Sequence, residues 1–217
     1  MKPIDALPPP SIPVPLFAMS LLYGGMTCIA GVLGSKQIAL GPLAVEAGIL
    51  PFLLLVAISS AVTRLYGRRT GDRLVRFGFV PLATAIALTW LVINLPTDAG
   101  MYEPAKEAFP IVLGQSARLM FAGIIAYGVS MTLNVVLFAR LSGRSGRFGL
   151  VAGAVAAMIS QVVDTLIFIT VAFIGVRPIG ALIAGQALAK VVLSLVLVPL
   201  LIGLFVTLAR RHEARRI

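Results

Sequence analysis

Long apolar stretches separated by short polar segments run along most of the chain. Six of them approach or exceed 20 residues, the length that a helix needs to cross the hydrocarbon core of a bilayer. Their residues do not alternate between apolar and polar, as they would in the strands of a membrane barrel. The pattern therefore predicts six transmembrane helices, at residues 16–33, 48–65, 77–95, 116–140, 148–174 and 179–209.

The composition agrees with an all-α polytopic integral membrane protein. Apolar residues make up 59% of the 217-residue chain and charged residues only 12%, about half of what a soluble domain carries. We expect three parts: a Pro-rich tail at residues 1–15, a six-helix transmembrane domain at residues 16–209 and a basic tail at residues 210–217. The lone cysteine, Cys28, excludes an internal disulfide and any multi-cysteine metal site.

Basic residues gather in alternate connections between the predicted helices. Five arginines occur at positions 64–76, three at positions 140–147 and four at positions 210–216, whereas the connection at residues 96–115 is net acidic. The positive-inside rule then predicts that both termini lie in the cytoplasm, and an even number of spans agrees. These arginines are expected to face anionic lipid headgroups. The net charge of +10 therefore does not call for nucleic acid as a partner.

Two charged residues, Asp164 and Lys190, lie deep inside predicted spans, where an unpaired charge is costly. Asp164 shares one stripe of the fifth span with Gln161, Thr165 and Phe168. Lys190 lies in the sixth span, and both charges fall roughly 15 Å below the predicted outer surface at 1.5 Å per residue. Adjacent antiparallel helices would bring them together. Since buried ion pairs are often no more stabilising than apolar replacements, function is favoured over a purely structural pair.

The fourth predicted span adds further polar residues. Tyr127, Ser130 and Asn134 are spaced three and four apart and share a face, and Arg118 lies near the outer end. Asn134 is a candidate for either a functional or a structural role. Hydroxyl groups in membrane helices more often bond to their own backbone or hold helices together.

These residues occur in an order that resembles the queuosine precursor transporter family, also called the vitamin uptake transporter family. Ser160-Gln161-x-x-Asp164-Thr165 with Phe168 is similar to the family's Ser-(Gln/Glu)-x-x-Asp-Thr-x-x-Phe signature. Weaker similarities extend from about Thr27 onward, at Ala47-Gly48, Pro51-Phe52, Tyr66-Gly67, Arg118 with Ala122 and Tyr127, and Lys190 with Pro199. The chain departs from the family at Ser60, Arg64 and Asn134, where acidic residues are common.

The resemblance implies uptake of 7-cyano-7-deazaguanine or 7-aminomethyl-7-deazaguanine, precursors of a tRNA modification, across the bacterial inner membrane. A single carboxylate can accept both adjacent donors of such a ring, while Lys190, Gln161 or Arg118 could donate to the ring carbonyl. Phe168 and Tyr127 are candidates for the apolar walls. The predicted substrate-binding residues are Asp164, Lys190, Gln161, Thr165, Arg118, Asn134 and Phe168, with no metal and no cofactor.

An alternative function is the substrate-binding component of an energy-coupling-factor importer for another small heterocycle or vitamin. The sequence has no Walker motif, so ATP hydrolysis would require a partner. Energy-coupling subunits and further copies of this chain stay open as partners. An enzyme is disfavoured, because the only histidine, His212, lies in the C-terminal tail and Cys28 has no neighbouring base.

Overall fold

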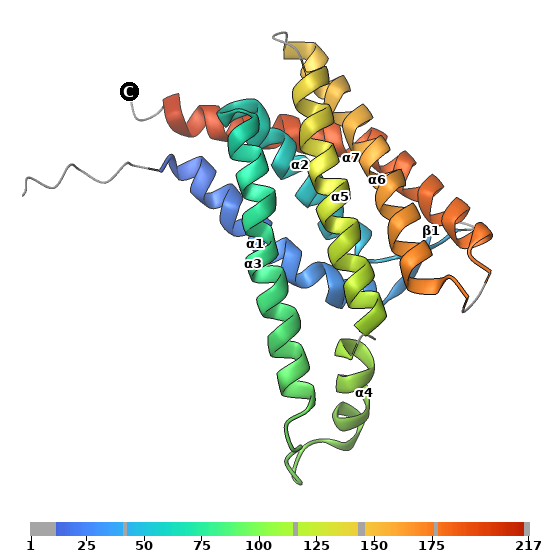
Figure 1. Cartoon of the computed structure of the whole chain (residues 1–217). Coiled ribbons are helices and arrows are strands. Elements are labelled where there is room, and N and C mark those ends of the chain that lie inside the picture. Colours follow the sequence, from blue (N-terminus) through green and yellow to red (C-terminus); the bar gives the residue numbers. More distant parts are fainter. Residues whose placement is uncertain (1–11, 41–42, 115–116, 143–145, 176–177, 215–217) are drawn as a thin grey trace, which may run out of the picture.

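Helices make up nearly all of the computed structural model, which describes residues 12–40, 43–114, 117–142, 146–175 and 178–214. Within these residues, 6 helices are long and apolar enough to cross a membrane. The predicted all-α architecture with six spans is therefore confirmed. In chain order the elements are α1 Val14–Gly34, β1 Gln37–Leu40, β2 Leu43–Glu46, α2 Ile49–Tyr66, α3 Arg68–Ile93, α4 Glu103–Leu113, α5 Ala117–Leu141, α6 Gly146–Phe173 and α7 Gly180–Ala214 (Figure 1).

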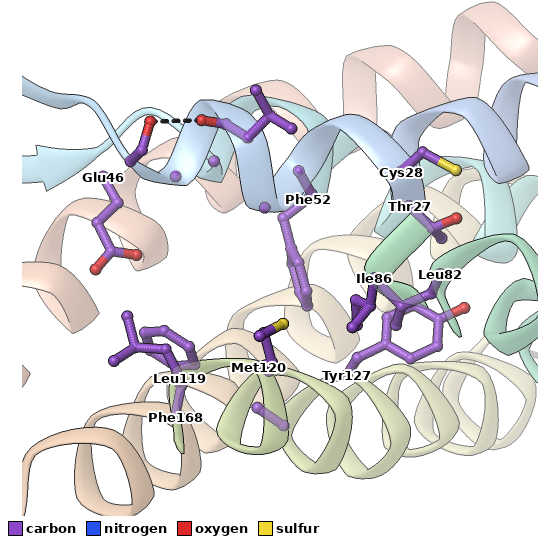
Figure 2. A pocket seen from close by; sticks show the side chains of 18 of the residues that line it. Thr27, Cys28, Glu46, Phe52, Leu82, Ile86, Leu119, Met120, Tyr127 and Phe168 are labelled. Carbon is purple, nitrogen blue, oxygen red and sulfur yellow. Dashed lines mark hydrogen bonds between the residues drawn. The ribbon is translucent and has the colours of Figure 1, made fainter. Parts of the chain in front are cut away.

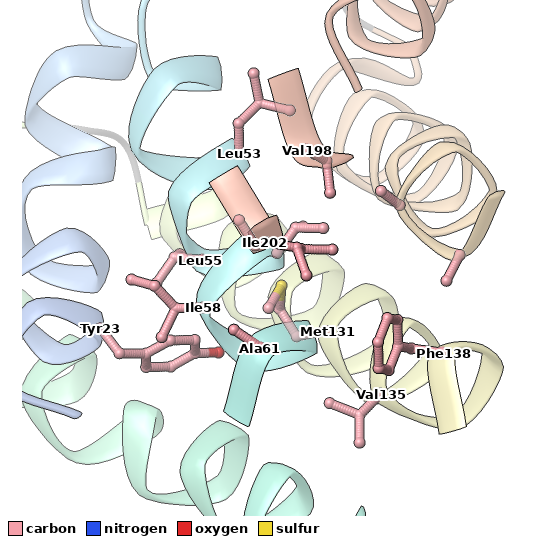
Figure 3. Packing of buried hydrophobic residues seen from close by; sticks show 14 of the residues in the cluster. Tyr23, Leu53, Leu55, Ile58, Ala61, Met131, Val135, Phe138, Val198 and Ile202 are labelled. Carbon is pink, nitrogen blue, oxygen red and sulfur yellow. The ribbon is translucent and has the colours of Figure 1, made fainter. Parts of the chain in front are cut away.

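Helix α2 forms the centre of the bundle and contacts α1, α3, α5, α6 and α7. Its side chains are buried along most of its length, and Figure 3 shows Ala61 close to Met131 of α5 and Ile58 close to Tyr23 of α1. The peripheral helices instead expose large apolar side chains, such as Phe77 in α3 and Leu200 in α7. Large apolar side chains on the outside of a bundle are expected where hydrocarbon rather than water surrounds the helices.

Small residues let α3 approach its neighbours closely. A Cβ atom at Gly71 would collide with Thr63 of α2, and one at Gly78 would collide with Tyr23 and Tyr127. The two tyrosine hydroxyls lie 2.9 Å apart, and the Tyr127 hydroxyl also donates to a backbone carbonyl of α3 at 3.1 Å. Close backbone approach followed by polar contacts is a typical way for membrane helices to associate.

The connection between the second and third spans differs from the prediction. We expected a basic loop before residue 77, but α3 begins at Arg68 and contains Arg69, Arg73 and Arg76. Gly67 alone separates the two helices, with φ at 83°, a conformation that suits glycine. Arginine is a good helix former, so the basic segment extends the helix beyond the apolar span.

Two elements between the spans were not predicted from the apolar pattern. One is an antiparallel hairpin in which Gln37 pairs with Glu46 and Ile38 pairs with Val45. The other is α4, which contacts α3. Most of the predicted 1–15 tail lies outside the described residues, as do positions 215–217, while α7 continues as far as Ala214.

Candidate functional site

A cavity of about 530 Å³ lies within the bundle. All six long helices contribute to its lining, together with β2 and the end of α4. Its walls are mostly apolar, with a few polar side chains. This volume and lining are typical of a site for a small organic molecule.

An ion pair between α6 and α7 forms the charged part of the cavity wall. Lys190 Nζ lies 2.9 Å from Asp164 Oδ2, and their side chains are only 11% and 7% exposed. The hydroxyl of Ser130 in α5 donates to Asp164 Oδ1 at 3.1 Å. The pairing that was predicted from equal depth is therefore confirmed, and three helices meet at this one carboxylate.

Three aromatic side chains provide flat surfaces in the same cavity. Phe52, Tyr127 and Phe168 all line it, and Figure 2 shows Phe52 reaching from α2 toward Met120 of α5. Lys190 Nζ also lies 5.6 Å from the centre of the Phe52 ring, within range of a cation–π interaction. Phe168 and Tyr127 were predicted as walls. Phe52 was not assigned this role, although it belongs to the Pro51-Phe52 pair noted in the sequence.

Three of the predicted site residues lie behind the cavity wall. Gln161, Thr165 and Asn134 are fully buried and do not line the cavity. The Asn134 amide donates to the hydroxyls of Ser59 and Ser60 at 3.0 and 3.1 Å, which ties α5 to α2. Within the described residues, Asn134 Oδ1, Thr165 Oγ1 and both polar atoms of Gln161 have no hydrogen-bond partner. These residues form a polar layer next to the ion pair.

Arg118 lies apart from Asp164 and Lys190. It is exposed, and its guanidinium donates to the carbonyl oxygens of Val171 at 2.7 Å and Ile174 at 2.8 Å. Those carbonyls belong to the last turn of α6 and to the residue that follows it, where backbone acceptors have no partner within the helix and a cation is favourable. The contacts of Arg118 are therefore those of a helix cap, and it does not line the cavity.

The lining includes polar residues that were not among the predicted site residues, and two of them are Gln186 and Glu46. Gln186 lies one turn before Lys190 on α7, and Glu46 ends strand β2. The sequence placed Glu46 in a connection ahead of the second span, with no indication that the chain folds back there. The hairpin brings this half-buried carboxylate to the cavity.

The chain matches one known protein family. Residues 46–204 fit the profile of the family described as "Putative vitamin uptake transporter". None of the curated proteins matches the chain at a significant level, and neither does any solved structure. The matched segment starts at Glu46 and contains α5, α6 and the part of α7 that carries Lys190.

Proposed function

Because the chain belongs to the vitamin uptake transporter family, we propose that it imports a queuosine precursor across the bacterial inner membrane. The family and the six long apolar helices make the chain a multi-pass membrane transporter and not an enzyme. The proposed substrates are 7-cyano-7-deazaguanine and 7-aminomethyl-7-deazaguanine, following the sequence resemblance described above.

One observation carries this proposal: a buried carboxylate with an ammonium group directly beside it. A guanine-like ring presents, side by side, an exocyclic amine, a ring N–H and a carbonyl oxygen. The two donors match the two oxygens of Asp164, and the carbonyl then falls next to Lys190, which lies 2.9 Å from Oδ2. Hydrogen bonds to charged groups contribute about 1.5–3 kcal/mol each, so this edge would be recognised strongly.

Ligand binding would change the partners of Asp164 and Lys190. In the structure, Lys190 and Ser130 occupy one Asp164 oxygen each, which keeps the buried carboxylate satisfied. An arriving ligand would take over these acceptor positions, and the Lys190 ammonium would shift to the ring carbonyl. Phe52 and Phe168, both in the lining, offer apolar surfaces to the ring faces.

The direct test is uptake of labelled precursor by cells that cannot synthesise it. We expect Asp164→Asn to reduce the affinity for precursor by about tenfold to a hundredfold, because the amide cannot accept both donors. Asp72→Asn is a matched control, since Asp72 pairs with Arg68 in the first turns of α3 and does not line the cavity. Wild-type uptake by Asp164→Asn at equal expression would refute the assignment of the site.

A further inference from the structure

We propose that Gln161, together with Asn134 and Ser194, forms a second binding position, which receives the polar edge of the ligand after it leaves Asp164. These three residues are called the inner polar triad below. The inference rests on the proposed function and deepens it, because it divides transport into binding at the ion pair and passage along the triad. The burial of the three side chains, their unpartnered polar atoms and their position next to the ion pair support it.

The polar atoms of the triad are buried and lack partners. All three side chains are 0% exposed. Within the described residues, both polar atoms of Gln161, Oδ1 of Asn134 and the hydroxyl of Ser194 have no hydrogen-bond partner. A buried donor or acceptor that is left unpaired costs free energy, and an apolar side chain would avoid that cost. A ligand that passes the triad would supply the missing partners.

The triad lies one turn from the ion pair, toward the end of the bundle where α5 and α7 end in basic residues. Asp164 contacts Ser130 of α5 and Lys190 of α7, and α6 packs against both of these helices (Figure 1). Each member of the triad is three or four residues from one of these contact residues, in the direction of that basic end. Residues at this spacing share one side of a helix, so the triad continues the contact between the three helices at the next level of the bundle.

The carboxamide of Gln161 matches the same ligand edge as the ion pair, but without charge. A guanine-like ring presents a ring N–H and a carbonyl oxygen side by side. The Gln161 oxygen can accept from that N–H while the amide nitrogen donates to the carbonyl. Hydrogen bonds between uncharged groups contribute less than those to charged groups, so the ligand would be held more weakly at Gln161 than at Asp164 and Lys190. A weaker second position suits release at the basic end, which the positive-inside rule predicts to face the cytoplasm.

The triad is closed off from the cavity in this structure. Its three residues do not line the cavity, so a ligand at Asp164 reaches Gln161 only after α5, α6 or α7 has shifted. Binding to the cavity should therefore not depend on Gln161, whereas the rate of transport should. This separation also gives a role to a predicted substrate-binding residue that lies behind the cavity wall.

The experiment compares ligand affinity, uptake rate and stability for Gln161→Met, which keeps the length of the side chain and removes both polar atoms. We expect the purified variant to bind labelled precursor within about twofold of the wild-type affinity. Cells that cannot synthesise the precursor should take it up about tenfold more slowly at equal expression, the value of one or two uncharged hydrogen bonds. The thermal unfolding midpoint should equal or exceed that of the wild type, because two unpartnered atoms are removed.

A matched control is Gln37→Met, the same change at an exposed residue of β1 that does not line the cavity. It should leave affinity, uptake rate and unfolding midpoint at their wild-type values. Gln161→Ser separates contact with the ligand from simple hydration, because a hydroxyl can be solvated but cannot place a separate donor and acceptor against the ring edge. We expect it to be as slow as Gln161→Met, and wild-type uptake by Gln161→Ser would overturn the ligand contact.

Three further results would contradict the inference. Wild-type uptake by Gln161→Met would show that the carboxamide is not needed for passage. An equal loss of affinity and uptake would assign Gln161 to the ion-pair site, and a lower unfolding midpoint would show that the protein itself holds the carboxamide. Where Gln161→Met does not reach the membrane, Ser194→Ala decides: it should slow uptake about threefold at unchanged affinity, and a wild-type rate would count against the triad. If the wild-type protein neither binds nor takes up precursor, the proposed function itself fails.

Discussion

The buried carboxylate of Asp164 depends on Lys190 for stability as well as for the proposed chemistry. Removing one partner of a buried ion pair leaves an uncompensated charge and typically costs about 3–5 kcal/mol, whereas neutralising both often costs little. We therefore expect Lys190→Met to lower the thermal unfolding midpoint markedly in detergent. The Asp164→Asn, Lys190→Met double variant should recover most of that loss, because no buried charge is left without a partner.

Transport should respond differently from stability in these same variants. The double variant is expected to be stable yet inactive, because its cavity no longer holds the carboxylate and ammonium that match a guanine-like edge. Uptake and unfolding measured on the same preparations would show this. A double variant with full uptake would mean that the pair is structural, and the proposed site would have to be abandoned.

At the residue scale, helix geometry explains which side chains could be assigned from the sequence. Successive residues turn by about 100° and four residues by about 400°, so Phe168 follows Asp164 around the helix by only about 40°. Both line the cavity. Thr165 is turned about 100° away from Asp164, and Gln161 lies nearly one turn earlier on α6. The sequence predicts that these residues share one stripe of α6. Which of them face the cavity is determined by how the neighbouring helices pack against that stripe.

At the element scale, α5 and α2 are held together by the buried amide of Asn134. Its Nδ2 donates to the hydroxyls of Ser59 and Ser60 at 3.0 and 3.1 Å. Hydrogen bonds between membrane helices contribute about 0.6 kcal/mol on average, with a maximum near 1.7. We expect a double-mutant cycle between Asn134→Ala and Ser60→Ala to give a coupling energy of about 0.5–1.5 kcal/mol in thermal or denaturant unfolding.

A matched control for this cycle is Ser160→Ala. Ser160 is also fully buried, but its hydroxyl donates to carbonyl oxygens of its own helix, at Ala156 and Ala157. Its removal should therefore show no coupling to Asn134→Ala. Strictly additive effects of Asn134→Ala and Ser60→Ala would contradict the role of the amide in joining α5 to α2.

The elements themselves were predictable to different degrees. All six spans could be predicted from the lengths of the apolar runs. In a bilayer, each spanning helix must satisfy its own backbone hydrogen-bonding groups, so it has to be long and continuous. The hairpin did not, since strands as short as Gln37–Leu40 and Leu43–Glu46 cannot be distinguished from the ends of apolar helices by pattern alone. The position of Glu46 in the cavity lining could not be predicted either, because it depends on where this hairpin folds.

At the scale of the whole molecule, the cavity and most of the arginines lie toward opposite ends of the bundle. The lining uses the end of α1, the start of α2 and the start of α5, whereas Arg68, Arg69 and Arg140 lie where α2 meets α3 and where α5 ends. If the arginine end faces the cytoplasm, as the positive-inside rule predicts, the cavity faces the outside. That arrangement suits a protein that collects its substrate for uptake.

Buried polar atoms between the ion pair and the arginine end favour a carrier that works without ATPase subunits. One turn beyond the ion pair, toward the arginine end, Asn134, Gln161 and Ser194 bury polar atoms that have no partner among the described residues. Each such atom costs about 1–3 kcal/mol, and a conformation that opens toward the arginine end would hydrate it. In such a conformation these polar groups would face a route across the bundle.

We accordingly predict that the purified chain alone, in proteoliposomes, accumulates precursor when a proton gradient is imposed. A protonophore should abolish accumulation, and no ATPase subunits should co-purify from native membranes. The substrate-binding component of an energy-coupling-factor importer would behave in the opposite way, because it binds substrate but depends on its partners for transport. Binding without uptake, together with a stable ATPase complex, would therefore identify that alternative and leave the buried polar atoms of Asn134, Gln161 and Ser194 with a structural role.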